Sequence, residues 1–228
     1  MIVTNVPILI VHKILSDAVA VGAHFGYQDL HELIRRFLFK QLNEDGDGFD
    51  VDLDRCPQFR GHVYVHNSAT STFFAPSDIS GTGGMRRERI YATKSWFGGQ
   101  GRHDTVLMEK DAKQDGFAGL HVARVLLFLS FTYANVKYSC ALIHWFSTVG
   151  DRPCDLTGMW KVQPDYYPNG AAYKCIIHVD CILRAAHLMP VYGNGIVPED
   201  HKYENTLDHF KMFYVNKYID HHAHEIIF

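Results

Sequence analysis

Several features that mark particular classes of protein are scarce or missing in this chain of 228 residues. The five cysteines are odd in number and contain no CxxC pair, so the sequence indicates neither a disulfide scaffold nor a zinc ribbon. The net charge is only -3, which excludes a protein that coats DNA through an overall basic field. Repeats and low-complexity tracts are also missing. With 47% hydrophobic residues, the composition is that of an ordinary globular protein.

Long hydrophobic runs are lacking as well. Pro7, His12, Lys13 and Asp17 interrupt the apolar start of the chain before it reaches the roughly 20 residues of a membrane span, and no basic segment precedes it. We therefore predict neither secretion nor membrane insertion. The abrupt start is also compatible with a fragment of a longer protein. Because three cysteines lie in apolar runs, we expect the reduced, buried thiols of an intracellular protein.

Residues 1–60 are predicted to form a helical N-terminal extension that contains an acidic loop. Apolar residues recur at helical spacing over 27–42 and predict a helix there. The acidic segment NEDGDGFDVDLD follows. An EF-hand that begins at Asp45 would place Asp50 where glycine is required and Cys56 where a chelating glutamate is required. We therefore interpret the segment as a solvated acidic loop and not as a calcium site.

Residues 61–228 are predicted to form a β-barrel-like domain with a C-terminal helix. Strands are expected at its β-branched and aromatic runs. These runs are 62–66, 104–109, 122–133, 138–146, 159–162 and 175–182. The short connection 134–136 predicts a hairpin, and a last helix is expected from Asn205, with an apolar stripe at Leu207, Phe210, Phe213 and Tyr214. The predicted fold class is α+β, with an antiparallel β-barrel-like centre flanked by N-terminal and C-terminal helices.

Histidine is the compositional outlier, with 15 residues, and its side chain can ligate metals or transfer protons. His222 and His224 would form an i, i+2 pair on a strand, and His178 and Asp180 would share one face of another, with His144 on a neighbouring run. A catalytic metal site also needs a third converging ligand, and no HExxH or similar signature supplies one. Hydrogen bonding on a half-solvated sheet is the alternative, so we expect no resident metal or cofactor.

The segment GTGGMRRERI, residues 81–90, has the glycines of a phosphate loop without its other residues. A P-loop requires Lys and then Ser or Thr directly after the last glycine, whereas Met85 and Arg86 follow here. What remains is a flexible glycine turn and a local basic patch of Arg86, Arg87 and Arg89. Such arginines can hold the phosphates of a partner, or carboxylates within the same domain.

The three tryptophans, Trp96, Trp145 and Trp160, are candidate aromatic contacts. Aromatic side chains on a barrel surface can line a peptide groove, although a tryptophan on a strand can also be a core residue. No GxSxG elbow is present, and no cysteine lies in an electropositive, exposed setting. A serine or cysteine hydrolase is therefore not indicated.

Several blocks of the sequence carry a family resemblance. They are FFAPSDISGTGGMRRERI, SWFGGQGRHDTVLMEKD, GLHVARVLLFLSFTY, CALIHWF, DLTGMWKV, IIHVDCILRAAHLMPVYG and FYVNKYIDHHAHE. These blocks resemble the C-terminal region of fungal transposon-encoded proteins of the Plavaka type, from residue 30 to the end of the chain. The resemblance implies an origin in a mobile element and a nuclear setting. In those proteins the RNase H-like catalytic core lies upstream, so the resemblance implies an accessory module and carries over no catalytic residue.

A second similarity concerns the order HDTVLME, HVARVLLF, KYSCALIHWF and HVDCILRAAHLMPVYG. This order is similar to the strand order of bromo-adjacent homology domains, which are β-barrels that bind chromatin proteins and nucleosomes. The chain departs from that pattern because Ser147 and Thr148 follow Trp145 and Phe146, where a basic Arg-Pro pair is usual. Chromatin binding is implied here by analogy of architecture.

Two main hypotheses of function follow. The first is a non-enzymatic interaction module in the nucleus that binds a protein, such as a chromatin protein, or nucleic acid, through the three arginines of the basic patch and the tryptophans. The second is a metal-dependent hydrolase or nuclease that uses His144, His178 and Asp180 together with His222 and His224. A transposon relic that folds without a selected function is a third interpretation.

Overall fold

The structure, a computed structural model, describes residues 4–43, 51–76, 83–193, 202 and 205–228, with the backbone alone for 4–15. Its helices are α1 (Ala18–Phe25), α2 (Leu30–Leu42), α3 (Thr206–His209) and α4 (His221–Ile227). Three 3₁₀ turns lie in the described connections, η1 (Leu53–Arg55), η2 (Gly116–Gly119) and η3 (Val179–Cys181). No helix among the described residues is both long enough and apolar enough to cross a membrane.

The strands follow one another along most of the chain. They are β1 (Thr4–Asp17), β2 (His62–Phe74), β3 (Met85–Thr93), β4 (Arg102–His103), β5 (Thr105–Glu109), β6 (Leu120–Tyr133), β7 (Val136–Val149), β8 (Lys161–Pro164), β9 (Lys174–His178), β10 (Ile182–Ala186), β11 (Leu188–Pro190) and β12 (Phe213–Val215). Every predicted strand run overlaps one of these elements, although only the last two residues of 159–162 are in β8.

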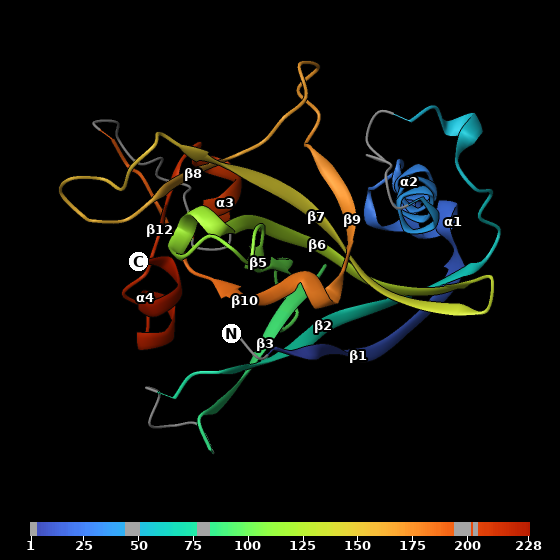
Figure 1. The fold of residues 1–228 in the computed structure, drawn as a ribbon. Helices are drawn as coiled ribbons and strands as arrows, with labels where there is room; N and C mark the ends of the chain where they lie inside the picture. Colours follow the sequence, from blue (N-terminus) through green and yellow to red (C-terminus); the bar gives the residue numbers. More distant parts are fainter. Residues whose placement is uncertain (1–3, 44–50, 77–82, 194–201, 203–204) are drawn as a thin grey trace.

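The strands pair antiparallel and curl into a partial barrel (Figure 1). β2 pairs with β1 along one edge, and along its other edge it pairs first with β6 and then with β3. β5, β6, β7 and β9 pair in that order, η3 leads from β9 into β10, and β10 returns to pair with β5. The predicted α+β class with an antiparallel sheet is confirmed, and the barrel is only partial.

The long hairpin of β6 and β7 forms where the sequence predicts it. Ala134 and Asn135 at its turn have φ of 47° and 64°, the left-handed conformation that a two-residue hairpin loop requires. Pairing extends from Tyr133 and Val136 to the far ends of the two strands, with one shift of register. The hairpin forms the central part of the sheet in Figure 1.

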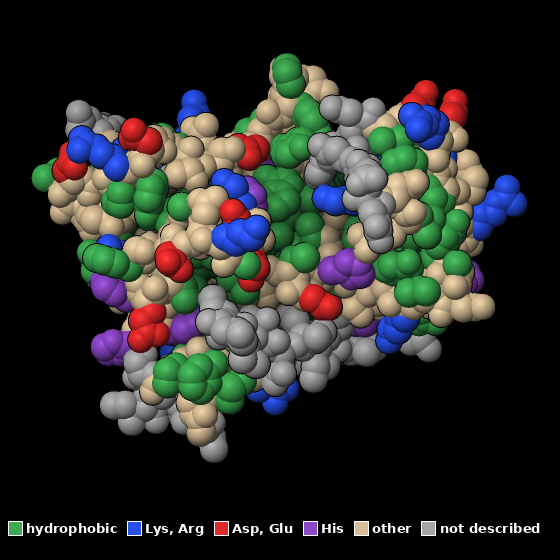
Figure 2. All heavy atoms as spheres, viewed as in Figure 1, with side chains coloured by type: hydrophobic (Ala, Val, Ile, Leu, Met, Phe, Trp, Pro, Cys, Tyr) green, Lys and Arg blue, Asp and Glu red, His purple; other side chains and the backbone are tan. Residues whose placement is uncertain are grey.

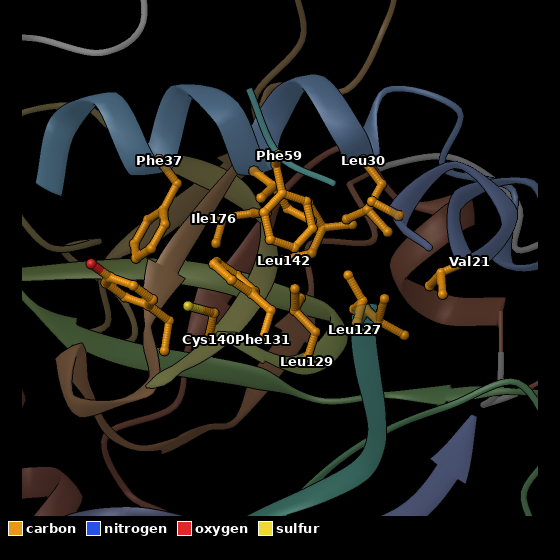
Figure 3. Close-up of a cluster of buried hydrophobic side chains, with 14 of the residues drawn as sticks. Val21, Leu30, Phe37, Phe59, Leu127, Leu129, Phe131, Cys140, Leu142 and Ile176 are labelled. Carbon is orange, nitrogen blue, oxygen red and sulfur yellow. The ribbon is translucent and has the colours of Figure 1, made fainter. Parts of the chain in front are cut away.

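Helix α2 covers one face of this hairpin. Its apolar stripe, Leu30, Ile34, Phe37 and Leu38, is fully or almost fully buried. Figure 3 shows Leu30 and Phe37 directed toward strand residues below the helix, and Ile34 and Leu38 belong to the same core cluster. The strand residues are Leu127, Leu129 and Phe131 of β6, Cys140 and Leu142 of β7, and Ile176 of β9. The helix predicted over 27–42 is therefore confirmed, with its start at Leu30.

The domain division predicted at residue 60 stays a prediction. Across that position, β1 pairs with β2 from Thr4 opposite Phe73 to Asp17 opposite His62. This strand differs from the prediction, which places a helical extension in this part of the chain. Buried side chains of α1 and α2 also share a core cluster with those of β2, β6 and β7. Of the acidic segment, residues 44–50 lie outside the described residues.

The C-terminal segment differs from the single helix predicted from Asn205. Only Thr206–His209 is helical there, and Phe213–Val215 forms a strand that pairs with β8 and β11. Phe213 and Val215 are completely buried. Burial of alternate residues against the sheet outweighs the helical spacing of the aromatic residues. A separate short helix, α4, follows the strand.

The cysteines agree with the prediction only in part. All five are unpaired, and Cys56, Cys140 and Cys175 are buried. Cys154 is half-buried and Cys181 is exposed, which corrects the expectation that every thiol is buried. Cys181 lies in η3, where the chain leaves β9 and the alternation of inward and outward residues ends.

Candidate binding groove

An open groove of about 1230 Å³ lies between β3 and the segment that contains β10 and β11. One wall is formed by β3, the loop 94–101 and β4, and the opposite wall by residues 184–190. The groove brings together three residues of the predicted interaction set, Arg86, Arg89 and Trp96. We take it as the candidate binding site because it gathers these residues from two separate elements.

The edge of β3 that faces away from β2 meets Asp104, a residue that lines this groove. The N–H of Tyr91 donates to the Asp104 carboxylate at 2.9 Å, and the carbonyl of Tyr91 accepts from the Asp104 N–H, also at 2.9 Å. Hydrogen-bonding direction alternates along an antiparallel strand. The backbone groups of Arg89 and Arg87 therefore also point away from β2.

A cluster of aromatic and charged side chains lies at the end of the groove wall that β3 forms. The guanidinium of Arg102 lies over the rings of Tyr91 (4.5 Å) and Trp96 (4.9 Å). It also donates to both carboxylate oxygens of Asp104, at 2.7 and 3.1 Å. Arg102 and Asp104 are two residues apart in extended backbone, so their side chains project to the same side. The cluster fixes the half-buried Trp96 at the groove wall.

Phe97 follows this cluster and is 93% exposed. Its φ is 50°, a left-handed conformation that costs a residue with a Cβ roughly 1 kcal/mol or more. Its ring lies edge-on to Trp96 at 4.7 Å. A strained backbone that presents an exposed apolar ring beside a groove is typical of a binding loop.

The floor of the groove contains a buried ion pair between β10 and the start of α4. Arg184, only 2% exposed, donates to Asp220 at 2.6 and 2.8 Å and to Nδ1 of His222 at 3.2 Å. Its guanidinium also lies over Phe73 at 4.9 Å. Burial by itself would raise the pKa of Asp220, but the hydrogen bonds from Arg184 and from the Ala223 amide outweigh burial and lower that pKa to about 2.

A second carboxylate, Glu88 of β3, lies on the other side of Arg184. Burial raises the pKa of Glu88, and the opposing charge of Arg184, whose Nε is 3.9 Å from the Glu88 carboxylate, reduces that rise. The carboxylate also accepts the Ala185 N–H at 3.0 Å. Arg86 contacts Asp220 at 3.6 Å. Acidic side chains of this chain therefore already pair with the cations on the floor.

A further ion pair joins Arg124 of β6 to Asp208 of α3. Nε of Arg124 is buried without a hydrogen-bond partner among the described residues. His103 lies nearby in the groove wall. Burial, reinforced by the positive charge of Arg124, lowers the pKa of His103 to about 4. The histidine is therefore neutral at physiological pH.

These ion pairs leave little unpaired positive charge in the groove. Arg102, Arg124 and Arg184 each contact a carboxylate. Arg89 is exposed and makes no ion pair with any described residue. On the face drawn in Figure 2, Lys and Arg side chains lie among Asp and Glu side chains. The local positive charge is therefore that of a small patch.

The remaining residues of the predicted interaction set lie elsewhere. Arg87 is exposed on β3, beside the groove residues Arg86 and Arg89. Trp145 and Trp160 line a separate cavity of about 620 Å³. There the indole N–H of Trp145 donates to Cys175 Sγ at 3.1 Å, and Trp160 stacks on Phe117 at 5.3 Å. The three tryptophans therefore do not form one surface.

The predicted metal-binding or acid/base residues are not brought together. His144 hydrogen-bonds the carbonyl of Asp165 at 2.7 Å, and His178 hydrogen-bonds the side chain of Gln41 at 2.9 Å. The expectation that His178 and Asp180 share a strand face is wrong, because β9 ends at His178 and Asp180 lies in η3. Each strand histidine therefore has a local structural partner.

The C-terminal histidines are likewise not the strand pair that the sequence predicts. His222 and His224 lie on α4, where residues two apart point in different directions. His222 is buried against Phe73, with ring centroids 4.6 Å apart, and His224 stacks on Phe228 at 5.3 Å. Among the described residues, no three His, Cys, Asp or Glu side chains gather closely enough to hold a metal ion.

Sequence reasoning misses the residues that organise the groove, chiefly Arg102, Arg184 and Asp220. A signal exists for the first of these, because the RHD triplet places Arg102 and Asp104 on one side of an extended segment. No comparable signal exists for Arg184 and Asp220, which lie 36 positions apart. Their pairing depends on the position of α4 against β10.

Comparisons with protein-family models, with curated proteins and with solved structures found no match to this chain. The resemblance to Plavaka-type proteins and the similarity to bromo-adjacent homology domains therefore stay predictions from the sequence. The functional proposal below therefore depends on the residues and the charges of the groove.

Proposed function

We propose that this protein is a non-enzymatic interaction module whose groove binds an extended protein segment with acidic side chains. One observation carries the proposal. The exposed side chains of Arg89 and Phe97 flank a groove whose floor charges are already paired. An acidic side chain would meet Arg89 in a charge-assisted hydrogen bond, and an apolar side chain would meet Phe97.

A protein partner fits this pattern of charge better than nucleic acid does. A groove that follows a nucleic-acid backbone presents several unpaired Lys or Arg side chains, because each one neutralises a phosphate. Here Arg89 and the adjacent Arg87 supply most of the accessible positive charge, since the other groove arginines contact carboxylates. Two guanidinium groups match one or two carboxylates.

The wider setting belongs to the same proposal. The sequence blocks that resemble Plavaka-type proteins support an origin in a mobile element and a nuclear location, with a chromatin protein as one class of partner. We assign no catalytic step to the groove. A metal-dependent hydrolase has no comparable support, because its proposed histidines have separate structural partners.

A titration with three probes tests this function. The probes are a peptide of alternating Glu and Val, the corresponding Lys and Val peptide, and single-stranded oligothymidylate, each at about 50 and 200 mM salt. We expect only the acidic peptide to bind. Arg89→Ala should weaken its binding by about fivefold, since one such contact contributes roughly 1 kcal/mol.

Arg60→Ala is the matched control, because Arg60 is an exposed arginine outside the groove. This variant should bind the acidic peptide with unchanged affinity. Tight binding of oligothymidylate with a steep dependence on salt would identify nucleic acid as the partner instead. If none of the three probes binds, the proposed function is contradicted.

A further inference from the structure

The hydrogen bonds at both ends of β3 identify which of its backbone groups point outward. At the hairpin end, the Ala75 N–H donates to the Gly84 carbonyl at 2.7 Å. At the other end, the backbone groups of Tyr91 turn away from β2 to Asp104. The register of β3 on β2 has no shift between these points. Even-numbered residues of β3 therefore bond to β2, and odd-numbered residues turn outward.

Arg87 and Arg89 are the two central outward-facing residues. In the part of the chain that the structure describes, their outward N–H and C=O groups make no hydrogen bond. β4 pairs with β3 only at Ala92 and Thr93, beyond this stretch. A row of unpaired N–H and C=O groups on a sheet edge is a template for another strand.

We propose that the groove takes its ligand as an added antiparallel β-strand, paired with β3 through the backbones of Arg87 and Arg89. This inference rests on the proposed function and specifies its binding mode. The occupant is an extended segment of the protein partner with an acidic-x-acidic pattern. Antiparallel pairing is the arrangement of every strand pair in this sheet, and main-chain pairing on an exposed edge is a recurring mode of peptide recognition.

The direction of the side chains gives the acidic-x-acidic pattern. Residues directly opposite each other in paired strands project to the same face. The two ligand residues opposite Arg87 and Arg89 therefore lie beside their guanidinium groups, and they are two positions apart. Carboxylates at these positions would pair with both arginines.

The middle residue of the pattern faces the other side of the added strand. On that side, the carboxylate of Glu88 accepts the N–H of Ala185 from β10 at 3.0 Å. A third acidic side chain there would approach Glu88, so the middle residue is uncharged and small enough to lie beside β10. Valine meets these requirements in the Glu–Val probe.

Two variants at one position separate backbone pairing from side-chain charge. Arg89→Ala removes the guanidinium and keeps the amide N–H, whereas Arg89→Pro removes both. Because this N–H turns away from β2, proline removes no hydrogen bond of the β2–β3 ladder. With the Glu–Val peptide as the probe, we expect Arg89→Pro to bind about fivefold more weakly than Arg89→Ala. Equal affinities of the two variants would count against strand addition.

A modified probe tests the same point without a proline in the protein. In the proposed antiparallel pairing, the peptide's glutamate N–H groups donate to the carbonyls of Arg87 and Arg89, and its valine N–H groups point away. Methylation of the glutamate amide nitrogens should abolish binding, and methylation of the valine amide nitrogens should preserve it. Equal binding of both methylated peptides would overturn strand addition and leave the acidic-peptide function standing. No binding of the unmodified peptide would contradict both.

Discussion

Arg184 and Asp220 form a two-point ion pair at the floor of the groove, with N–O distances of 2.6 and 2.8 Å. Arg184 belongs to β10, and Asp220 is the N-cap of α4, where its side chain also accepts the Ala223 N–H at 2.7 Å. One carboxylate therefore starts the C-terminal helix and fixes the position of the groove floor. Its ionisation should control both stability and the shape of the site.

The ionisation of Asp220 predicts a loss of stability in acid. Its folded pKa of about 2 lies below the unfolded value of about 3.9, so its contribution is fully present above pH 4 and is lost as the pH falls toward 2. The expected loss is at most about 3 kcal/mol in the free energy of unfolding. Denaturant titrations at several pH values measure it.

Asp220→Asn checks the source of this acid sensitivity. The variant should be less stable at pH 7 by about 3 kcal/mol, because it leaves the buried Arg184 without its counter-charge, and its stability should vary less between pH 4 and 2. Asp155→Asn, which breaks the exposed pair with Arg152, is the control and should change little. An unchanged pH profile in Asp220→Asn would exclude Asp220 as the cause.

His103 predicts a separate loss of stability at milder acidity. Its folded pKa of about 4 is below the unfolded value of 6.5, so the unfolded chain binds more protons between these values. Stability is therefore lost as the pH falls from 6.5 toward 4, by at most about 3 kcal/mol. His103→Gln should flatten the stability profile over this range. The hypothesis fails if both proteins lose stability in parallel from pH 6.5 to 4.

Phe97 should matter for binding and not for folding. Phe97→Gly removes an exposed ring and relieves the left-handed backbone strain, so the free energy of unfolding should stay within about 1 kcal/mol of the wild-type value. Affinity for the Glu–Val peptide should fall several-fold. Leu156→Ala is the control, since Leu156 is 95% exposed and lies outside the groove. A Phe97→Gly variant that binds normally would remove this ring from the site.

The core beneath α2 should be sensitive to cavity formation. Leu142 of β7 is completely buried in the cluster that Figure 3 shows. Leu142→Ala should lower the free energy of unfolding by about 3 kcal/mol or more. Leu42→Ala, at the exposed end of α2, should cost far less. Similar losses in the two variants, measured by denaturant titration, would argue against this packing.

The parts of the fold that the sequence predicts are those with strong local patterns. The β6–β7 hairpin has long β-branched and aromatic runs, and α2 has a clear apolar stripe, so both are predicted. β3 has no such pattern, because Arg86 and Glu88 occupy inward-facing positions of the strand. Their charges are balanced by Asp220 and Arg184, which are distant in the sequence.

The sequence likewise predicts only a part of the candidate site. The sequence alone shows that Arg86 and Arg89 lie close together and that Trp96 is nearby. The structure places all three residues in one groove. The groove exists because β10 returns to β5 and places Arg184 against Glu88. Periodicity identifies elements and not their pairing, so this arrangement is not available from the sequence.

Amide hydrogen exchange of the full chain, with and without the Glu–Val peptide, tests the central claim most directly. An added strand should protect the amides of Arg87 and Arg89, which turn outward in the free protein. The amides of Glu88 and Ile90 already bond to β2 and should change little, so they provide an internal control. Peptide binding without new protection at Arg87 and Arg89 would contradict the account.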